Sequence, residues 1–243
     1  VSLIDGWTSN HTLNGVFYNY WRFTFDNDKF HQVPEIGCLF KGKKVYDPRT
    51  GGTAYSANAA LVLYDYLRDD LGLSVNADKI DAASFIAAAN ICDEDVSLAE
   101  GGTEKRYEAH GVIDTGLPPG SNIEDILTAM SGSLVYVNGR FYVYAGATKT
   151  SKLSFDEGDI TSEINIIPRM SRRDNFNAVK GQFISPLNNF QLSDYPAVTS
   201  SVFEEEDNGE RIFNDLELPF TSSPSAAQRI AKIALYRNRQ PLA

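Results

Sequence analysis

Alternation of apolar and polar residues predicts several short strands, because successive side chains of a strand point to opposite faces. The clearest run lies within residues 13–30, where Phe17, Trp21 and Phe23 share one face. A second strand is predicted over residues 35–46. The same pattern predicts strands at 106–115, 162–168, 176–184, 200–206 and 211–220, with a long loop at 187–198.

Apolar residues at spacings of three and four predict two helices in the first half of the chain. One covers residues 57–71 with Ser56 as its N-cap, and the other covers residues 82–95 with Asp81 as its N-cap. The face of the first helix that we expect to be buried carries Leu61, Tyr64, Leu67 and Leu71. The second helix is rich in alanine, which favours helix formation and close packing.

Two further helices have clear start signals. Residues 122–131 follow the spacing of a capping box, in which Ser121 and Glu124 each bond the other residue's free amide. Residues 224–238 follow Ser223 as N-cap, with a proline at the first helical position. The apolar stripe of this last helix is expected to consist of Ala227, Ile230, Ala231, Ala234 and Leu235.

Residues 134–144 predict a β-hairpin. Asn138 and Gly139 suit the positive φ values of a type I′ turn, whose twist matches that of the flanking strands. Both faces of the hairpin are apolar, so we expect both to be covered, one of them by the helix at 122–131. The side-chain pairs expected across the hairpin are Tyr136 with Phe141 and Val135 with Tyr142.

Together these elements predict an α+β fold in two parts. Residues 1–50 and 149–243 are expected to form a discontinuous, β-rich domain. Residues 51–148 are expected to form a small α+β insertion domain that contains three helices and the hairpin. A chain of 243 residues is long enough to bury the cores of one large or two small domains.

The chain has a net charge of −10, so it has no general attraction to nucleic acid phosphates. Acidic runs lie at 93–95, 156–159 and 204–207, and basic residues gather at 41–44, 169–173 and 229–239. No stretch approaches the roughly 18 apolar residues that span a bilayer. The two cysteines, Cys38 and Cys92, are predicted to be free, buried thiols rather than a disulfide.

Residue types with catalytic potential form no recognisable motif. The three histidines are His11, His31 and His110. None of them has a metal-ligand spacing to another histidine or to a cysteine, and the sequence has no P-loop, GxGxxG, GxSxG or HExxH motif. Carboxylates recur at Asp65, Asp69 and Asp70 and at 93–95, but a glycosidase needs two that converge in one cleft. We therefore predict no catalytic, cofactor-binding or metal-binding residues and no enzyme activity.

Aromatic residues are numerous, and their positions in alternating stretches predict that most of them pack into the core. The alternative is an exposed aromatic patch that binds a sugar or a partner protein. Examples are Tyr18, Tyr20, Trp21, Tyr64, Tyr66 and Tyr142.

Several longer stretches resemble one protein family. They are GKKVYDPRTG, SANAALVLYDYLRDDLGL, DAASFIAAANICDE, FNAVKGQFISP at residues 176–186, and the closing LPFTSSPSAAQRIAKIALYRNRQ. Together they span most of the chain and are similar to the central tail-tip proteins of long-tailed bacteriophages and prophages. This family includes the host-specificity, or tip attachment, protein J of lambda-like phages. Because its members are far longer and the first residue here is Val1, we expect an internal segment of a larger polypeptide.

The resemblance implies a structural role. Family members lie at the distal end of the tail, where they form a trimeric hub that closes the tail tube. Their hub segments are similar to the tube-forming β-barrels of contractile-tail baseplates, which carry a helix beside the barrel. The resemblance thus implies that strands at 13–48 and 160–220 form an antiparallel, β-barrel-like hub domain, flanked by the C-terminal helix at 224–238.

The expected function is therefore that of a structural component of a virion tail tip, synthesised and assembled in the bacterial cytoplasm. Expected partners are two further copies in a homotrimer and other tail-tip, tail-tube, baseplate and fibre proteins, without stable membrane insertion. Acidic residues are expected to line the lumen, where like charge lets DNA pass without specific binding. Two alternatives are a tail-associated peptidoglycan hydrolase and a carbohydrate-binding module for host attachment. Receptor binding in lambda-like proteins is associated with their far C-terminal part, which disfavours the second alternative.

Overall fold

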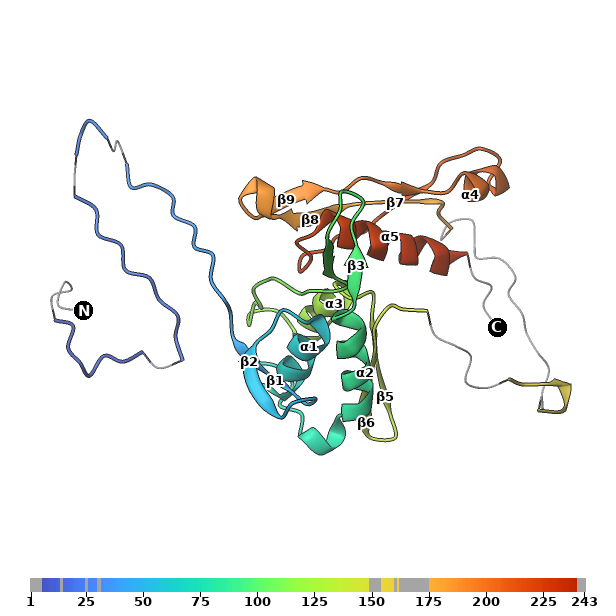
Figure 1. The fold of residues 1–243 in the computed structure, drawn as a ribbon, viewed down its shortest axis with the longest axis horizontal. Helices are drawn as coiled ribbons and strands as arrows, with labels where there is room; N and C mark the ends of the chain where they lie inside the picture. Colours follow the sequence, from blue (N-terminus) through green and yellow to red (C-terminus); the bar gives the residue numbers. More distant parts are fainter. Residues whose placement is uncertain are drawn as a thin grey trace. The chain divides into compact units, whose positions relative to one another are not determined.

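The computed structural model confirms the predicted α+β class. It describes residues 6–13, 15–24, 26–29, 32–148, 154–159, 161 and 175–239, and within them it has five α-helices and eleven short strands (Figure 1). The strands form five small sheets, and in the described ranges none of these sheets closes into a barrel. The chain divides into two compact units, Val1–Lys41 and Gly42–Ala243.

The first unit contains two extended segments that run antiparallel, residues 16–24 and 33–41, which we call the aromatic ribbon (Figure 1). The ring of Phe17 stacks on that of Phe40 with the centroids 4.2 Å apart. The side-chain amide of Asn19 donates to the Sγ atom of Cys38 at 2.8 Å. These contacts align the segments as in a hairpin, but no strand is assigned among the described residues before Lys44. The strand prediction for 13–30, and for most of 35–46, is therefore wrong.

The second unit opens with a short antiparallel hairpin and two packed helices. Strand β1 (Lys44–Asp47) pairs with β2 (Gly52–Tyr55), and helix α1 (Ala59–Arg68) packs against helix α2 (Ala82–Cys92). A short 3₁₀ turn, η1 (Ala77–Lys79), lies between the helices. Of the predicted face of α1, Leu61, Tyr64 and Leu67 are buried, whereas Leu71 lies beyond the end of the helix and is exposed.

The buried amide of Asn58, rather than Ser56, caps helix α1. Its oxygen accepts from the backbone amides of Ala60 at 3.1 Å and Leu61 at 3.3 Å. Its nitrogen donates to the carbonyl of Ala89 in α2 at 2.9 Å. Asn58 therefore begins α1 and also joins the two helices, which Ser56 does not do. The predicted cap of α2 is confirmed, because Asp81 accepts from the backbone amide of Ser84.

After α2 the chain forms a second short hairpin, β3 (Asp95–Ser97) with β4 (Thr103–Lys105). The strand predicted over 106–115 is not assigned beyond a single bridge at Glu108. Tyr107 and Ala109, which are two positions apart in this segment, are nevertheless buried.

Helix α3 (Pro119–Thr128) begins three residues earlier than predicted, with Pro118 at the N-cap position. Ser121 already lies inside the helix, so the predicted capping box does not form. The hairpin of β5 (Ser133–Val137) and β6 (Arg140–Tyr144) is confirmed, with φ of 50° at Asn138 and 77° at Gly139. Its predicted side-chain pairs are confirmed by the observed register.

The hairpin is covered on one face only. Strand β6 packs mainly against α2, rather than against the helix predicted at 122–131, and its Val143 is buried. Val135 and Val137 of β5, which point to the opposite face from Val143, are exposed, so the expectation that both faces are covered is wrong.

The C-terminal part contains two further sheets. Strand β7 (Ala178–Lys180) lies between β10 (Val198–Thr199), which is antiparallel to it, and β11 (Phe213–Asp215), which is parallel. Strand β8 (Gln182–Ser185) pairs with β9 (Gln191–Asp194) through the turn η3 (Pro186–Asn188). Thus the segment predicted as the loop 187–198 contains strand residues. The strand predicted at 200–206 is instead helix α4 (Ser201–Glu206).

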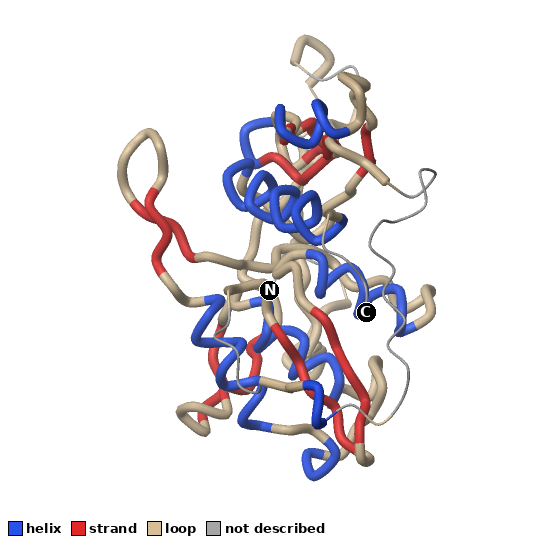
Figure 2. The backbone as a smooth tube through the Cα atoms, turned by 90° about the vertical axis from the view of Figure 1, so that its right-hand side faces the viewer, coloured by secondary structure: helices blue, strands red, loops and turns tan. Residues whose placement is uncertain are grey.

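Helix α5 (Pro224–Asn238) packs against β7 and β8, and Figures 1 and 2 show it running alongside these strands. Ser223 caps its N-terminus as predicted, by accepting from the amide of Ala226. Its predicted apolar stripe is buried at Ala227, Ile230, Ala231 and Leu235, and Ala234 is half-buried.

Buried apolar side chains of the second unit form one cluster that extends from Val45 to Leu235. It contains residues from both predicted parts, 51–148 and 149–243, and their division into an insertion and a discontinuous domain stays a prediction. The strand predicted at 162–168 lies outside the described residues. None of the helices in the described ranges has the length and apolar character needed to cross a bilayer.

Candidate functional site

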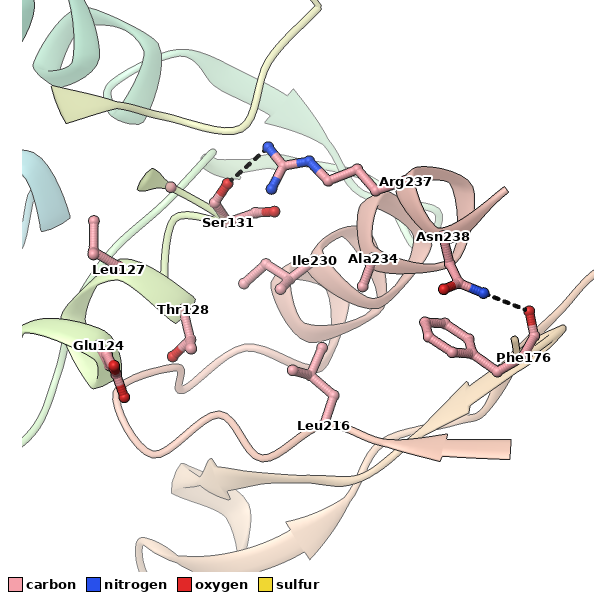
Figure 3. Close-up of a pocket in the computed structure, with 11 residues that line it drawn as sticks. Glu124, Leu127, Thr128, Ser131, Phe176, Leu216, Ile230, Ala234, Arg237 and Asn238 are labelled. Carbon is pink, nitrogen blue, oxygen red and sulfur yellow. Dashed lines mark hydrogen bonds between the residues drawn. The ribbon is translucent and has the colours of Figure 1, made fainter. Parts of the chain in front are cut away.

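A groove of about 670 Å³ lies in the second unit between α3, α5 and residues next to β7 and β11 (Figure 3). Its apolar walls come from Leu127 on α3, Ile230 and Ala234 on α5, and Phe176 and Leu216. Glu124, Thr128, Ser131, Gly132, Arg237 and Asn238 complete its lining. The groove suits an apolar group of a ligand or a partner chain.

Two polar side chains at the end of α5 are bound at the rim of this groove. Arg237 donates to the carbonyl of Ser131 at 3.3 Å, and Asn238 donates to the carbonyl of Phe176 at 3.3 Å (Figure 3). Glu124 supplies the carboxylate of the lining. With one carboxylate among its described lining residues, the groove lacks the pair of acidic groups that glycoside hydrolysis requires.

The sequence predicted no site here because the walls come from residues that are far apart in the chain. Ile230 belongs to the apolar stripe predicted for the last helix, and Leu127 lies on the helix predicted at 122–131. Phe176 and Leu216 reach the groove from segments whose pairing the sequence does not specify. No local signal would have identified the groove.

Two of the carboxylates considered for catalysis lie next to a lysine. Lys43 forms ion pairs with Asp65, at 2.6 Å, and with Asp69. The hydrogen bond from Lys43, followed by one from the backbone amide of Leu71, holds the pKa of Asp69 below its usual value. A carboxylate in this state remains ionised at neutral pH and does not act as a general acid.

The acidic run at 93–95 is neutralised in the same way. Arg49 binds Asp93 at 2.7 Å and also binds Asp47. The next two acidic residues pair with the neighbouring hairpin, Glu94 with Arg106 at 2.8 Å and Asp95 with Lys105 at 2.9 Å. In the run at 204–207, Glu204 pairs with Arg211 and Asp207 pairs with Arg239. Much of the acidic charge in these two runs is therefore balanced within the chain.

The histidines are not brought together. His11 is exposed and accepts from the backbone amide of Thr8, and His110 lies 3.6 Å from the Glu108 carboxylate on a partly exposed segment. His31 lies outside the described residues. Across the described ranges, no group of three or more His, Cys, Asp or Glu residues could hold a metal ion.

Both cysteines are free thiols, as predicted, but they differ in exposure. Cys92 is buried in α2, and burial raises the pKa of its thiol to about 12. A thiol in this environment stays neutral and unreactive. Cys38 is exposed on the aromatic ribbon, so the prediction that it is buried is wrong.

The aromatic residues divide between the two units. Tyr64 and Tyr66 are buried in the second unit, as predicted. Tyr18 and Trp21 are about half exposed on the ribbon, so the prediction that most aromatics pack into the core does not hold there. The alternation of apolar and polar residues within 13–30 identified these aromatic residues, but it does not show whether another element packs over them.

Comparison with known protein families and with curated protein sequences gives no match for this chain.

Proposed function

We propose that the chain is a structural, non-enzymatic segment of a bacteriophage or prophage tail tip. In this proposal it forms part of a trimeric hub that closes the tail tube and connects it to fibre and baseplate proteins. The observation that carries the proposal is the similarity of its longer stretches, between Gly42 and Gln240, to the tail-tip family.

The similar stretches supply the elements that build the second unit. They contain β1, α1, α2, β7, β8 and α5. Within them Leu61, Phe85, Val179 and Leu235 are fully buried. The similarity thus involves residues that determine packing, which makes it a stronger argument than a short surface motif.

We infer that the strands of the C-terminal part belong to a barrel-like wall that is completed in the assembled hub. The outer strands β10 and β11 are two and three residues long, which leaves short edges open to pairing. Packing of α5 against β7 and β8 is compatible with the helix that accompanies such barrels. The net charge of −10 supports acidic residues facing a lumen, whereas two of the acidic runs are largely paired within the chain.

The proposal is tested on intact particles of the phage or induced prophage that encodes the chain. Gold-labelled antibodies against the chain should bind at the distal end of the tail, and quantitative mass spectrometry should give three copies per particle. Labelling elsewhere on the particle, or particles that lack the chain, would contradict the proposal.

A second measurement distinguishes the proposed structural role from the alternative of a peptidoglycan hydrolase. The purified chain should release no soluble fragments from peptidoglycan, and the Asp65→Asn variant should behave in the same way. Release that depends on Asp65 would instead establish an enzyme.

A further inference from the structure

We propose that the groove between α3 and α5 binds a fatty acid, with the hydrocarbon chain in the groove and the carboxylate on Arg237. The inference goes beyond the proposed hub function and does not depend on it. It is carried by the size and apolar lining of the groove and by the state of the arginine at its rim.

Several apolar side chains of the groove are only half-buried by the protein itself. These side chains are Leu127 on α3, Ala234 on α5, and Phe176 and Leu216, and Ile230 beside them is buried. Together they form a concave apolar surface around about 670 Å³, and small-molecule sites occupy roughly 300–1,000 Å³. The groove therefore has the size and the apolar character of a small-molecule site.

The lining suits a hydrocarbon chain better than a segment of another protein. It consists of 11 residues, whereas one side of a specific protein interface has about 20–30. A peptide would also bring backbone amides and carbonyls, which need hydrogen-bond partners when they are buried. Thr128 already donates to the carbonyl of Asp125 at 2.7 Å, and Asn238 donates to that of Phe176 at 3.3 Å. A hydrocarbon chain needs no such partners.

Arg237 places a positive charge at the rim of the groove. Its guanidinium donates to the carbonyl of Ser131 at 3.3 Å, and Figure 3 shows the side chain reaching from α5 toward this residue. The bond holds the guanidinium in place but does not neutralise it, because the acceptor is an uncharged carbonyl. A guanidinium has several N–H donors and matches the geometry of a carboxylate, so it can bind a ligand carboxylate at the same time.

The other arginines in and beside α5 already have carboxylate partners. Arg229 binds Glu104 at 2.7 Å, and Arg239 binds Asp207. Arg237, by contrast, has no aspartate or glutamate partner among the described residues. A ligand carboxylate would supply the partner that these two neighbours find within the chain.

Charge also determines the orientation of the ligand. Glu124 lies in the middle of α3, whereas Ser131, to which Arg237 is bonded, follows the end of that helix. A carboxylate is therefore attracted to the Arg237 end of the groove and repelled at the Glu124 end. Because the net charge of −10 repels anions in general, binding should depend on this one arginine.

The test uses the full 243-residue chain and isothermal titration calorimetry at pH 7.5. Octanoate, 1-octanol and octylamine are the first three probes, because they share one hydrocarbon chain and differ in the head group. Decanoate, which is longer by two methylene groups, tests whether the chain is buried. The variants are Arg237→Gln at the rim and Ala234→Phe, which fills apolar space in the groove. The matched control is Arg140→Gln, an exposed arginine outside the lining whose loss changes the net charge equally.

Octanoate should bind the wild type and the control at one site per chain, with a Kd of about 0.1–1 mM. Decanoate should bind about 10-fold more tightly, and 1-octanol about 10-fold more weakly than octanoate. Arg237→Gln should weaken octanoate at least 10-fold and leave 1-octanol unchanged, because an uncharged head group does not need the guanidinium. Ala234→Phe should weaken both. Circular dichroism verifies the fold of each variant, and the exposed position of Arg237 keeps its test valid if Ala234→Phe does not fold.

Several results would overturn the inference. They are no binding of octanoate or decanoate, equal affinities of octanoate and 1-octanol for the wild type, and equal losses in Arg237→Gln and Arg140→Gln. Preferred binding of octylamine that is lost in Glu124→Gln would show a site for cations instead. Tighter binding of N-acetyl-leucyl-leucine than of octanoate would show that a peptide C-terminus, and not a fatty acid, occupies the groove.

The two proposals fail in different ways. If antibodies label the tail tip but octanoate does not bind, the fatty acid site is wrong and the hub function stands. If octanoate binds through Arg237 but no particle contains the chain, the hub function is wrong and the site stands.

Discussion

At the scale of single residues, Asp207 joins the ends of three elements. Its carboxylate accepts from Asn177 at 2.8 Å and from the guanidinium of Arg239. Asn177 is fully buried and also accepts from the backbone amide of Ile212 at 2.8 Å. Hydrogen bonding, mainly from Arg239, holds the pKa of Asp207 below its usual value. This cluster thus fixes the ends of α4 and α5 near the start of β7.

Replacing Asp207 by Asn should lower the free energy of unfolding by about 1–2 kcal/mol at pH 7, because charge-assisted hydrogen bonds are lost. The lowered pKa means that Asp207 contributes its full stabilisation above the pKa of about 3.9 of the unfolded chain. This contribution declines below that value and is lost as the pH falls through the lowered pKa of the folded state. Urea titrations of wild type and variant at pH 7 and at pH 3 measure the difference. The exposed Glu205, changed to Gln, serves as the control and should have little effect. A difference that stays constant down to pH 3 would contradict this account of Asp207.

The two cysteines should differ sharply in reactivity. In dilute native protein at pH 8, maleimide should modify one thiol per chain, Cys38, because Cys92 is buried and its pKa is raised to about 12. In urea both thiols should react. Mass spectrometry of the labelled peptides checks the result, and modification of Cys92 in the native state would show that α2 opens readily.

At the scale of elements, the junction of β7 and β8 depends on a glycine. A Cβ atom at Gly181 would lie 2.0 Å from the backbone oxygen of Leu216. That segment is held in place because the amide of Leu216 donates to the carbonyl of Lys180 at 2.8 Å. The close approach of the two backbones therefore leaves no space for a side chain.

Gly181→Ala should consequently destabilise the protein by about 3 kcal/mol, through displacement of the backbone beside β11. Thermal unfolding followed by circular dichroism measures the loss. Gly120→Ala provides the comparison, since Gly120 lies in α3 with open space around it. It should leave stability unchanged or raise it by about 0.5 kcal/mol. Equal stabilities of the two variants would argue against the close packing at Gly181.

Elements with strong local signals could be predicted from the sequence. The hairpin turn at Asn138 and Gly139 and the caps Asp81 and Ser223 depend on residues only a few positions apart. The α1 cap could not be assigned correctly, because Asn58 is favoured by a bond to Ala89, 31 residues away. The groove could not be predicted for the same reason, because its walls come from residues far apart in the sequence that meet only after the chain has folded.

Helix α4 shows how one local signal can have two structural meanings. Asp207-Asn208-Gly209 has the residues of a turn between the strands predicted at 200–206 and 211–220, but it ends helix α4. Asn208 adopts a φ of 62°, and the amide of Gly209 donates to the carbonyl of Glu204 at 2.7 Å. Both structures need positive φ values, so these residues do not discriminate between them.

At the scale of the whole molecule, the core cluster belongs to the second unit alone, because its members run from Val45 to Leu235. A chain that begins at Gly42 should therefore fold by itself. Its far-ultraviolet circular dichroism should keep the helical signal, and its midpoint of thermal unfolding should stay within a few degrees of that of the full chain. A loss of cooperative unfolding would show that the first unit contributes to the core.

The position of β7 between β10 and β11 has a consequence for biosynthesis. This strand leaves the ribosome before both of its neighbours and before α5, the helix that packs against it. At typical translation rates, the roughly 60 residues from Ala178 to Asn238 take about 3–12 s to synthesise. During that interval Val179 and Phe183 of the nascent chain lack their final neighbours. We expect this part of the protein to depend most on chaperones as it emerges.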